Sequence, residues 1–413
     1  MAQPPSRRTG FRIPALLGGA AAACAVVLAT TSCAGLDRPR TPTHASFAEY
    51  RQGALSLLER QRAFQSTEKT AELEWNAPRE WRPANPPTRG VLLVHGLGDS
   101  PWSFHDIGEQ LAGRGFLVRT VLLPGHGTRP EDMLDVRLED WRRVVEEQTR
   151  LLRAEVGEVY LGGFSTGANL VLTHAYRRDD IAGLLLFSPA FKSDTDYDWV
   201  TPWIGWLRPW LREPDGVRPM QNAVRYLTVP TNGFAQFYRS SRAARQALAG
   251  TPYGKPVLMV VAEHDSVLDT AYLAQTFSTR FTHPDSRLVW YGSAPAQVAD
   301  DPRILVRSDH LPELRISQFS HMGLMFSADN PLYGATGSLR LCWNGQETAD
   351  TAACEQGAPV WFSDWGYREP DKIHARLTFN PHFAWQGAVM ERVLNGSGQP
   401  PMLAAVPSAQ PGH

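Results

Sequence analysis

Residues 157–175 read Gly-Glu-Val-Tyr-Leu-Gly-Gly-Phe-Ser-Thr-Gly-Ala-Asn-Leu-Val-Leu-Thr-His-Ala, and this stretch decides the fold. The short apolar run at 159–164 predicts a buried strand, and residues 166–176 predict a helix. Ser165 stands between them, with a glycine two positions away on either side. A strand that turns sharply into a helix exposes the residue at the turn, and glycines at these positions remove side chains that would clash.

Gly163, Ser165 and Gly167 form a Gly-x-Ser-x-Gly pattern. The pattern alone occurs often by chance, but its position between a strand and a helix is typical of a nucleophile elbow. The alternative is a buried strand that ends in an ordinary Gly-Ser turn. A serine hydroxyl becomes a nucleophile only when it is exposed, oriented and next to a base. The groups around Ser165 therefore decide between the two interpretations.

Apolar runs alternate with helical segments on both sides of this stretch. Strands are predicted at 91–94, 116–123, 159–164, 182–187 and 256–262, and helices at 45–65, 103–113, 138–156, 166–176 and 270–281. Continuous apolar strands separated by helices indicate a mostly parallel sheet with helices on both faces. The predicted fold is therefore of the α/β class.

The chain has 413 residues, of which 43% are hydrophobic, and can bury a large core. The predicted organisation is an export signal over 1–33, a tether and N-terminal helix over 34–70, a core in two parts over 71–190 and 251–396, a cap over 191–250, a loop insertion over 327–378 and a flexible tail over 397–413. The net charge of −1 gives no basis for binding nucleic acid.

The N-terminal segment is predicted to direct export. Three arginines among the first twelve residues precede a charge-free apolar run at 13–29. Cys33 follows small residues after that run and resembles the lipidated cysteine of a bacterial lipoprotein, which predicts a membrane-anchored protein of the cell envelope. Cleavage near Ala34 to a soluble secreted or periplasmic protein, or retention of the apolar run as an anchor, are the alternatives.

Cys342 and Cys354 are the two cysteines outside the signal region. Export implies an oxidising compartment, in which two cysteines this close in sequence favour a disulfide. The alternative is a pair of free buried thiols.

A hydrolytic serine needs a base and a carboxylate that orients the base. Asp265 directly follows the strand at 256–262, so it is predicted to lie at the sheet edge where the serine emerges. Glu263 and Asp269 are its rivals, although Asp269 is better placed to cap the helix that follows.

His321 is the predicted base, because it follows a short strand-like run and precedes a turn that contains Gly323. His310 is the main rival, since residues 305–307 could form the last strand. His95 and His126 come before the serine and belong to His-Gly turns.

Two backbone amides are predicted to stabilise an oxyanion. Thr166 follows the serine at a helix N-terminus, where amides are unpaired and the helix dipole favours an anion. Leu97 lies between two glycines in the loop after the strand at 91–94, and those glycines let the backbone approach a substrate closely.

The predicted cap contains four tryptophans, at positions 199, 203, 206 and 210. They either pack the cap onto the core, or line an acyl pocket or touch a lipid surface. Prolines at positions 202 and 209 make one uninterrupted helix unfavourable here.

Five features of the sequence together are similar to a known family: Leu-Val-His-Gly-Leu-Gly at 93–98, Leu-Pro-Gly-His-Gly-Thr at 123–128, Trp141, the Gly-x-Ser-x-Gly at 163–167, and Val-Ala-Glu-His-Asp at 261–265. They resemble the α/β-hydrolase family, and within it the branch of monoacylglycerol lipases, carboxylesterases and serine aminopeptidases. The resemblance covers 88–192 and 251–326. It implies an α/β-hydrolase fold, with Ser165 as nucleophile, Asp265 as acid, His321 as base, and the amides of Leu97 and Thr166 as the oxyanion hole. The chain departs from the family in the long separation of acid and histidine, in the insertion at 327–378, and in a cap without a recognisable substrate motif.

The sequence thus predicts an exported serine hydrolase that cleaves a carboxylic ester or lipid through an acyl-enzyme on Ser165 and needs no metal or organic cofactor. One alternative is an aminopeptidase of the same fold, whose cap carboxylates would hold a free amine; the candidates are Asp194, Asp196, Asp198 and Glu213. Another is a non-catalytic envelope protein that retains the fold.

Overall fold

The computed structural model describes residues 43–195, 198–204, 208–211, 213–214, 216 and 219–396. The predicted export signal with Cys33, the tail at 397–413, Trp206, Asp196 and the side chain of Asp198 lie outside this part of the chain. Among the helices of the described part, none combines the length and the apolar character that crossing a bilayer requires.

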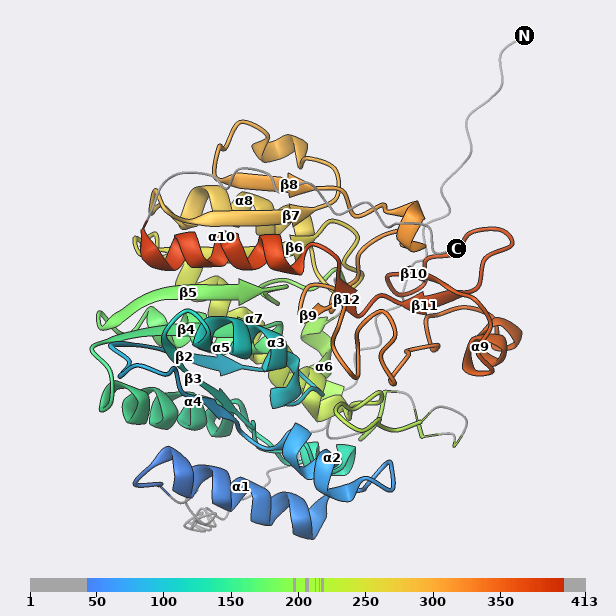
Figure 1. Cartoon of the computed structure of the whole chain (residues 1–413), viewed down its shortest axis with the longest axis horizontal. Helices are drawn as coiled ribbons and strands as arrows, with labels where there is room; N and C mark the ends of the chain where they lie inside the picture. The colour runs from blue at the N-terminus through green and yellow to red at the C-terminus, as the bar shows by residue number, and fades with distance from the viewer. Residues whose placement is uncertain are drawn as a thin grey trace, which may run out of the picture. The chain divides into compact units, whose positions relative to one another are not determined.

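An eight-stranded sheet forms the centre of the fold, in the order β1-β3-β2-β4-β5-β6-β7-β8 (Figure 1). Its strands are β1 (Glu80–Trp81), β2 (Arg89–Val94), β3 (Phe116–Val121), β4 (Glu158–Phe164), β5 (Ile181–Phe187), β6 (Val257–Ala262), β7 (Arg287–Tyr291) and β8 (Ile304–Arg307). β1 pairs antiparallel with β3, and every other neighbouring pair is parallel. The predicted mostly parallel sheet is confirmed.

Helices cover both faces of this sheet, as predicted (Figure 1). The helices are α1 (Phe47–Gln61), α2 (Lys69–Asn76), α3 (His105–Ala112), α4 (Leu138–Arg153), α5 (Thr166–Ala175), α6 (Thr201–Ile204), α7 (Thr231–Ala249), α8 (Thr270–Arg280), α9 (Thr348–Glu355) and α10 (Phe383–Asn395). Side chains alternate between the faces of a strand. Leu161 and Met259 pack in the core with α4, α5, α7 and α8, whereas Phe164 and Val260 pack in the core with α3 and α10.

Several elements differ from the sequence prediction. The strands β1 and β7 and the helix α2 were not predicted. α7 is a helix of 19 residues inside the predicted cap, and its buried side chains belong to the same core as α5. Its apolar residues are interleaved with polar ones that are also buried, such as Gln236 and Ser240, which weakens the periodic signal.

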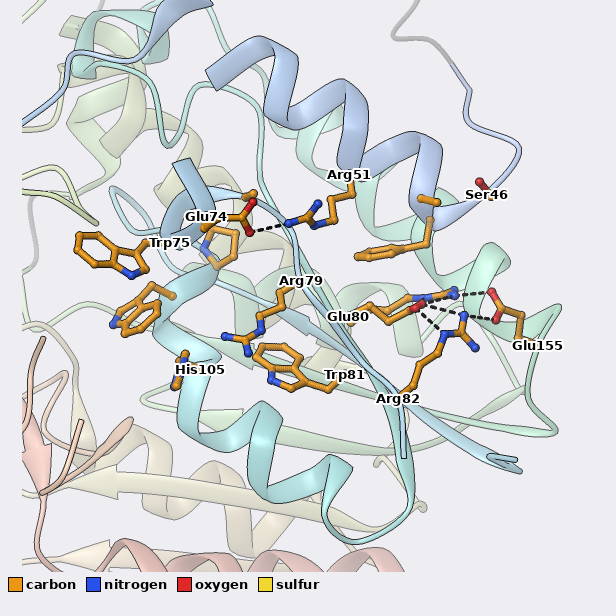
Figure 2. Close-up of a pocket in the computed structure, with 16 residues that line it drawn as sticks. Ser46, Arg51, Glu74, Trp75, Arg79, Glu80, Trp81, Arg82, His105 and Glu155 are labelled. Carbon is orange, nitrogen blue, oxygen red and sulfur yellow. Dashed lines mark hydrogen bonds and ion pairs between the residues drawn. The ribbon is translucent and has the colours of Figure 1, made fainter. Parts of the chain in front are cut away.

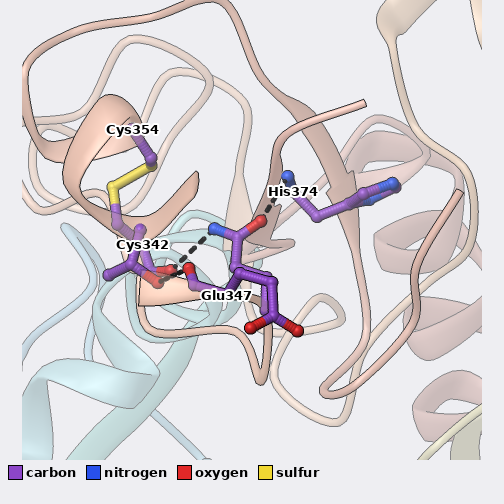
Figure 3. Close-up of a disulfide and its surroundings, with 6 residues drawn as sticks. Cys342, Glu347, Cys354 and His374 are labelled. Carbon is purple, nitrogen blue, oxygen red and sulfur yellow. Dashed lines mark hydrogen bonds between the residues drawn. A yellow bond between two sulfur atoms is a disulfide. The ribbon is translucent and has the colours of Figure 1, made fainter. Parts of the chain in front are cut away.

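The insertion at 327–378 folds around a disulfide between Cys342 and Cys354, whose Cα atoms are 5.7 Å apart, and the predicted pairing is confirmed. The side-chain amide of Gln346 donates to the Cys342 carbonyl at 3.1 Å. The backbone amide of His374 donates to the side-chain oxygen of Gln346 at 2.8 Å (Figure 3). These contacts tie the disulfide loop to the short strand β11 (His374–Arg376), which pairs in parallel with β10 (Trp361–Ser363).

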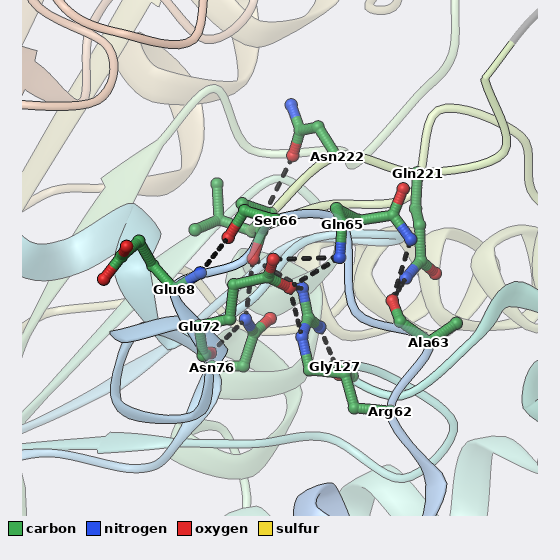
Figure 4. A network of polar contacts seen from close by, with 12 residues as sticks. Arg62, Ala63, Gln65, Ser66, Glu68, Glu72, Asn76, Gly127, Gln221 and Asn222 are labelled. Carbon is green, nitrogen blue, oxygen red and sulfur yellow. Dashed lines mark hydrogen bonds and ion pairs between the residues drawn. The ribbon is translucent and has the colours of Figure 1, made fainter. Parts of the chain in front are cut away.

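A buried ion pair fastens α1 and α2 to the core (Figure 4). The Arg62 guanidinium donates to the Glu72 carboxylate at 2.9 Å and to the Ala223 carbonyl at 2.6 Å, and Glu72 is fully buried. Arg62 also donates to the Gly127 carbonyl in the loop after β3. The pair therefore links the N-terminal helices to two loops that come much later in the chain.

Glu72→Gln removes the negative charge and leaves the Arg62 guanidinium buried without its counterion. We expect a loss of about 3–5 kcal/mol in the free energy of unfolding, the usual result of breaking a buried pair. Denaturant titration of the purified variant measures this loss.

The matched control is Glu74→Gln, because Glu74 pairs with Arg51 in an exposed setting. Exposed pairs contribute about 0–1 kcal/mol. Equal losses for the two variants would show that the Arg62 pair does not stabilise the attachment of α1 and α2.

Candidate active site

Ser165 lies at the turn between β4 and α5 in a strained conformation, with φ 53° and ψ −116°. Residues other than glycine rarely adopt positive φ. The flanking glycines allow the turn: a Cβ on Gly163 would lie 2.4 Å from the Ala168 nitrogen, and one on Gly167 would lie 1.9 Å from the Val94 oxygen. The backbone at Ser165 thus has the geometry of a nucleophile elbow.

Asp265 and His321 are in direct contact. Nδ1 of His321 lies 2.6 Å from Oδ2 of Asp265, and the other carboxylate oxygen accepts from the Val267 amide at 2.9 Å. Asp265 follows β6 by three residues and is only 4% exposed. Because Nδ1 is engaged by the carboxylate, Nε2 is the ring nitrogen that can serve a serine.

Ser165 and His321 line the same cavity, which has a volume of about 910 Å³. Leu97 and Thr166, the residues of the two predicted oxyanion amides, line it as well. Thr166 is the first residue of α5, so its amide has no partner within the helix. The structure therefore brings together the predicted serine, histidine and amide donors, with Asp265 directly behind the histidine.

The rival residues lie elsewhere in the structure. His310 is exposed, its Nδ1 lies 3.1 Å from the Ser317 carbonyl, and it is not among the described residues that line the cavity. Asp269 caps α8 by accepting from the Tyr272 amide at 2.9 Å, as predicted. Glu263 accepts from the Ser293 amide at 2.6 Å.

The run before His321 is not a strand, which corrects the sequence prediction. Ile316 makes only isolated bridges, with Leu311 and Phe362. His321 is instead held in a loop, and its ring packs against that of Phe164, with centroids 5.0 Å apart.

His95 and His126 are structural. Nδ1 of His95 lies 2.8 Å from the Gly96 carbonyl, and its Nε2 accepts from the Leu123 amide at 3.1 Å. Burial lowers the pKa of His95 to about 4 and that of His126 to about 3, so both rings are neutral at neutral pH. His95 therefore links the loop that carries Leu97 to the end of β3.

Asp364, which the sequence did not predict, supports the acid and the base together. Its side chain accepts from the Ser266 amide at 2.7 Å and from the His321 amide at 3.3 Å, and the residue is 1% exposed. The pKa of the Asp364 carboxyl is raised overall, mainly because the group is buried. The charge of Arg376 opposes this rise, and that of Asp265 adds to it. No motif marks Asp364, because it lies in the insertion, 43 residues after the histidine.

For Trp199 and Trp203, packing of the cap onto the core is contradicted, whereas contact with a lipid surface stays a prediction. Trp199 and Trp203 are 53% and 69% exposed, so they do not pack the cap onto the core. Trp199, Trp203 and Trp210 are absent from the described lining of the cavity, whereas Trp365 of the insertion belongs to it. Of the cap carboxylates, Asp194 lines the cavity and is exposed.

A second cavity of about 720 Å³ lies between α1, α2, β1 and α3 (Figure 2). Arginines and tryptophans dominate its described lining, and ion pairs such as Arg51–Glu74 hold its walls. None of the predicted catalytic residues lines it. The candidate active site is therefore the cavity at Ser165.

The mostly parallel sheet, the strained elbow and the Asp265–His321 pair define an α/β hydrolase. A family model described as "Serine aminopeptidase, S33" matches residues 85–294, slightly more than half of the chain, and the chain belongs to this family. The predicted family is confirmed.

Individual relatives are similar over about a quarter to just over half of the chain. A thermostable monoacylglycerol lipase of Bacillus sp. (strain H-257) is 37% identical over 101 residues, which are 24% of this chain and 40% of that protein. The chain thus spans less than half the length of this relative. The monoacylglycerol lipase structure of Paleococcus ferrophilus is 22% identical, with a TM-score of 0.43 over 55% of this chain and 91% of that chain. The structure of a soluble monoglyceride lipase variant of Saccharomyces cerevisiae is 17% identical, with a TM-score of 0.42 over 52% of this chain and 81% of that chain.

Asp364→Asn replaces one of the two carboxylate oxygens, each of which accepts a backbone hydrogen bond, with an NH2 group that faces a backbone donor. We expect the free energy of unfolding to fall by about 1–3 kcal/mol, the cost of unsatisfied buried polar groups. Denaturant titration measures it. Asp329→Asn, at an exposed residue of the same insertion, should have almost no effect. Equal stability of both variants would contradict the role assigned to Asp364.

Proposed function

We propose that this protein is a serine hydrolase that cleaves carboxylic esters, in the manner of a carboxylesterase or monoacylglycerol lipase, through an acyl-enzyme on Ser165. One observation carries the proposal: Ser165 at a strained elbow shares a cavity with His321, whose Nδ1 is held by Asp265. Family membership and the similarity to the bacterial monoacylglycerol lipase support it.

In the proposed mechanism, Ser165 Oγ attacks the acyl carbon while Nε2 of His321 takes its proton. Asp265 keeps the imidazole in the required tautomer and stabilises the imidazolium. The bond between the acyl carbon and the alcohol oxygen then breaks, and His321 returns the proton to the departing alcohol. Water activated by the same histidine hydrolyses the acyl-enzyme and restores Ser165.

The amides of Leu97 and Thr166 are proposed to stabilise the negative charge that develops on the acyl oxygen. Removal of one such donor typically costs about 10²- to 10³-fold in rate. Val229, Phe234 and Phe237 supply an apolar wall of the same cavity, which suits the acyl chain of an ester or lipid.

The other functions considered have less support. An aminopeptidase would need carboxylates that hold a free amine, and Asp194 is the one cap carboxylate among the described residues that line the cavity. A non-catalytic protein would have no need for the strain at Ser165 or for a buried carboxylate against His321.

We propose further that the protein is exported and anchored to a membrane through a lipid on Cys33. The apolar run at 13–29 and the small residues before this cysteine support the anchor. Mass spectrometry of the mature N-terminus in its native host should find an acylated Cys33. An unmodified N-terminus near Ala34 would contradict the anchor and favour a soluble exported protein.

Ser165→Ala should lower kcat for p-nitrophenyl ester hydrolysis by at least about 10⁴-fold, because it removes the nucleophile. The fold should be retained, since alanine fits the space of serine. A series of acyl chain lengths, assayed beside aminoacyl-nitroanilides, measures both activity and substrate class. Full ester activity in the variant would exclude the mechanism, and faster turnover of the anilides would favour the peptidase.

His321→Ala should reduce turnover by a similar factor, because His321 is the one histidine among the described residues that line the cavity. His310→Ala is the matched control and should leave kcat within about two-fold, as expected for an exposed side chain away from the site. The opposite result would assign the base to His310.

A further inference from the structure

Two arginines, Arg225 and Arg376, line the cavity that contains Ser165 and His321. Asp194 is the one carboxylate among the described residues of that lining, and it is exposed. The mostly apolar lining therefore includes two guanidinium groups. Of the two, Arg225 is the one without an ion pair among the described residues.

Arg225 lies directly beside the catalytic histidine loop. Its Nη1 is 2.7 Å from the sulfur of Met322, the residue that follows His321. The backbone of Arg225 is fixed because its amide donates to the Asn222 side chain at 2.9 Å. The guanidinium is thus held next to the residue that is proposed to protonate the leaving group.

Arg225 forms no ion pair within the part of the chain that the structure describes, and its side-chain hydrogen bond there is to the sulfur of Met322. Its Nε is buried and has no hydrogen-bond acceptor among them. An arginine stays charged in proteins and presents its donors in a fork that matches a carboxylate or phosphate. Leaving a donor of this kind unsatisfied is unfavourable, so this arginine is suited to binding an anionic ligand.

Arg376 is held more firmly, and its charge favours the ionised form of the buried Asp364 carboxylate. Its Nε donates to Asn344 at 2.7 Å, and its guanidinium lies 5.0 Å from the ring centre of Trp365. Arg225 and Arg376 also line a neighbouring cavity of about 410 Å³. Both arginines are therefore shared by the active-site cavity and this neighbouring cavity of about 410 Å³.

We propose that the substrates are esters whose alcohol portion carries an anionic group, a carboxylate or a phosphate, and that Arg225 binds this group. The proposal rests on the proposed ester hydrolysis. His321 must reach the departing alcohol oxygen, so the alcohol portion lies beside His321 and hence beside Arg225. The acyl chain then occupies the apolar part of the cavity lining, and the released alcohol carries the anionic group away unchanged.

Two pairs of esters with the same butyryl group test the proposal and distinguish the two anions. The phosphate pair is 1-butyrylglycerol 3-phosphate and 1-butyrylglycerol; the carboxylate pair is butyryloxyacetate and its methyl ester. For at least one pair, we expect kcat/KM of the wild type to be about 10-fold or more higher for the charged ester. Arg225→Gln should lower kcat/KM for that charged ester by about 10- to 100-fold, consistent with the loss of a charge-assisted hydrogen bond. The decisive quantity is the ratio of kcat/KM for the charged ester to that for its neutral partner, which should fall in the variant.

Arg225→Lys retains the charge and should recover part of the preference, and thermal melts confirm that each variant is folded. Arg242→Gln, at an exposed arginine of α7, is the control and should keep the preference of the wild type. Equal hydrolysis of charged and neutral esters by the wild type would overturn the proposal while leaving the ester hydrolase intact. So would an unchanged preference in Arg225→Gln. Failure of the wild type on all four esters would overturn the proposed function and this inference together.

Discussion

The close approach of two backbone segments at Ser165 is the constraint on which the site depends. Gly167 lies so near the Val94 oxygen that a Cβ would come within 1.9 Å of it. Any side chain at this position would push α5 away from the end of β2. The elbow would then lose both the strained serine and the short distance to the loop that carries Leu97. The absence of a side chain at Gly163 and at Gly167 thus allows Ser165, the N-terminus of α5 and the loop that carries Leu97 to lie close together.

The rest of the site is assembled by the sheet, because parallel strands end at one edge. β4 delivers Ser165, β2 leads to Leu97, and β6 leads to Asp265. His321 has no strand to position it, and the structure compensates with contacts from a later part of the chain. The Asp364 carboxylate accepts hydrogen bonds from the amides of His321 and Ser266, so the insertion links the loop of His321 to the loop that follows Asp265.

The sequence predicted those features of the fold and the site that depend on residues close together in the chain. The apolar strands, the glycines around Ser165 and the carboxylate after β6 were all predicted on such grounds, and the pairing of Cys342 and Cys354 was predicted from the expectation of export. Contacts made at long range were not predictable. Nothing near Asp364 or Arg225 in the sequence marks either residue, because each acquires its surroundings only when segments far apart in the chain meet. α7 was missed because its inward face mixes polar and apolar residues.

The most direct measurement is the site of covalent labelling by a fluorophosphonate, which reacts with activated serine hydroxyls. Peptide mass spectrometry of the labelled protein should find the phosphonyl group on Ser165. The His321→Ala variant should lose most of this labelling although the serine is still present, because the hydroxyl then lacks its base. Labelling at another residue, or undiminished labelling of Ser165 in that variant, would contradict the roles proposed for the serine and the histidine.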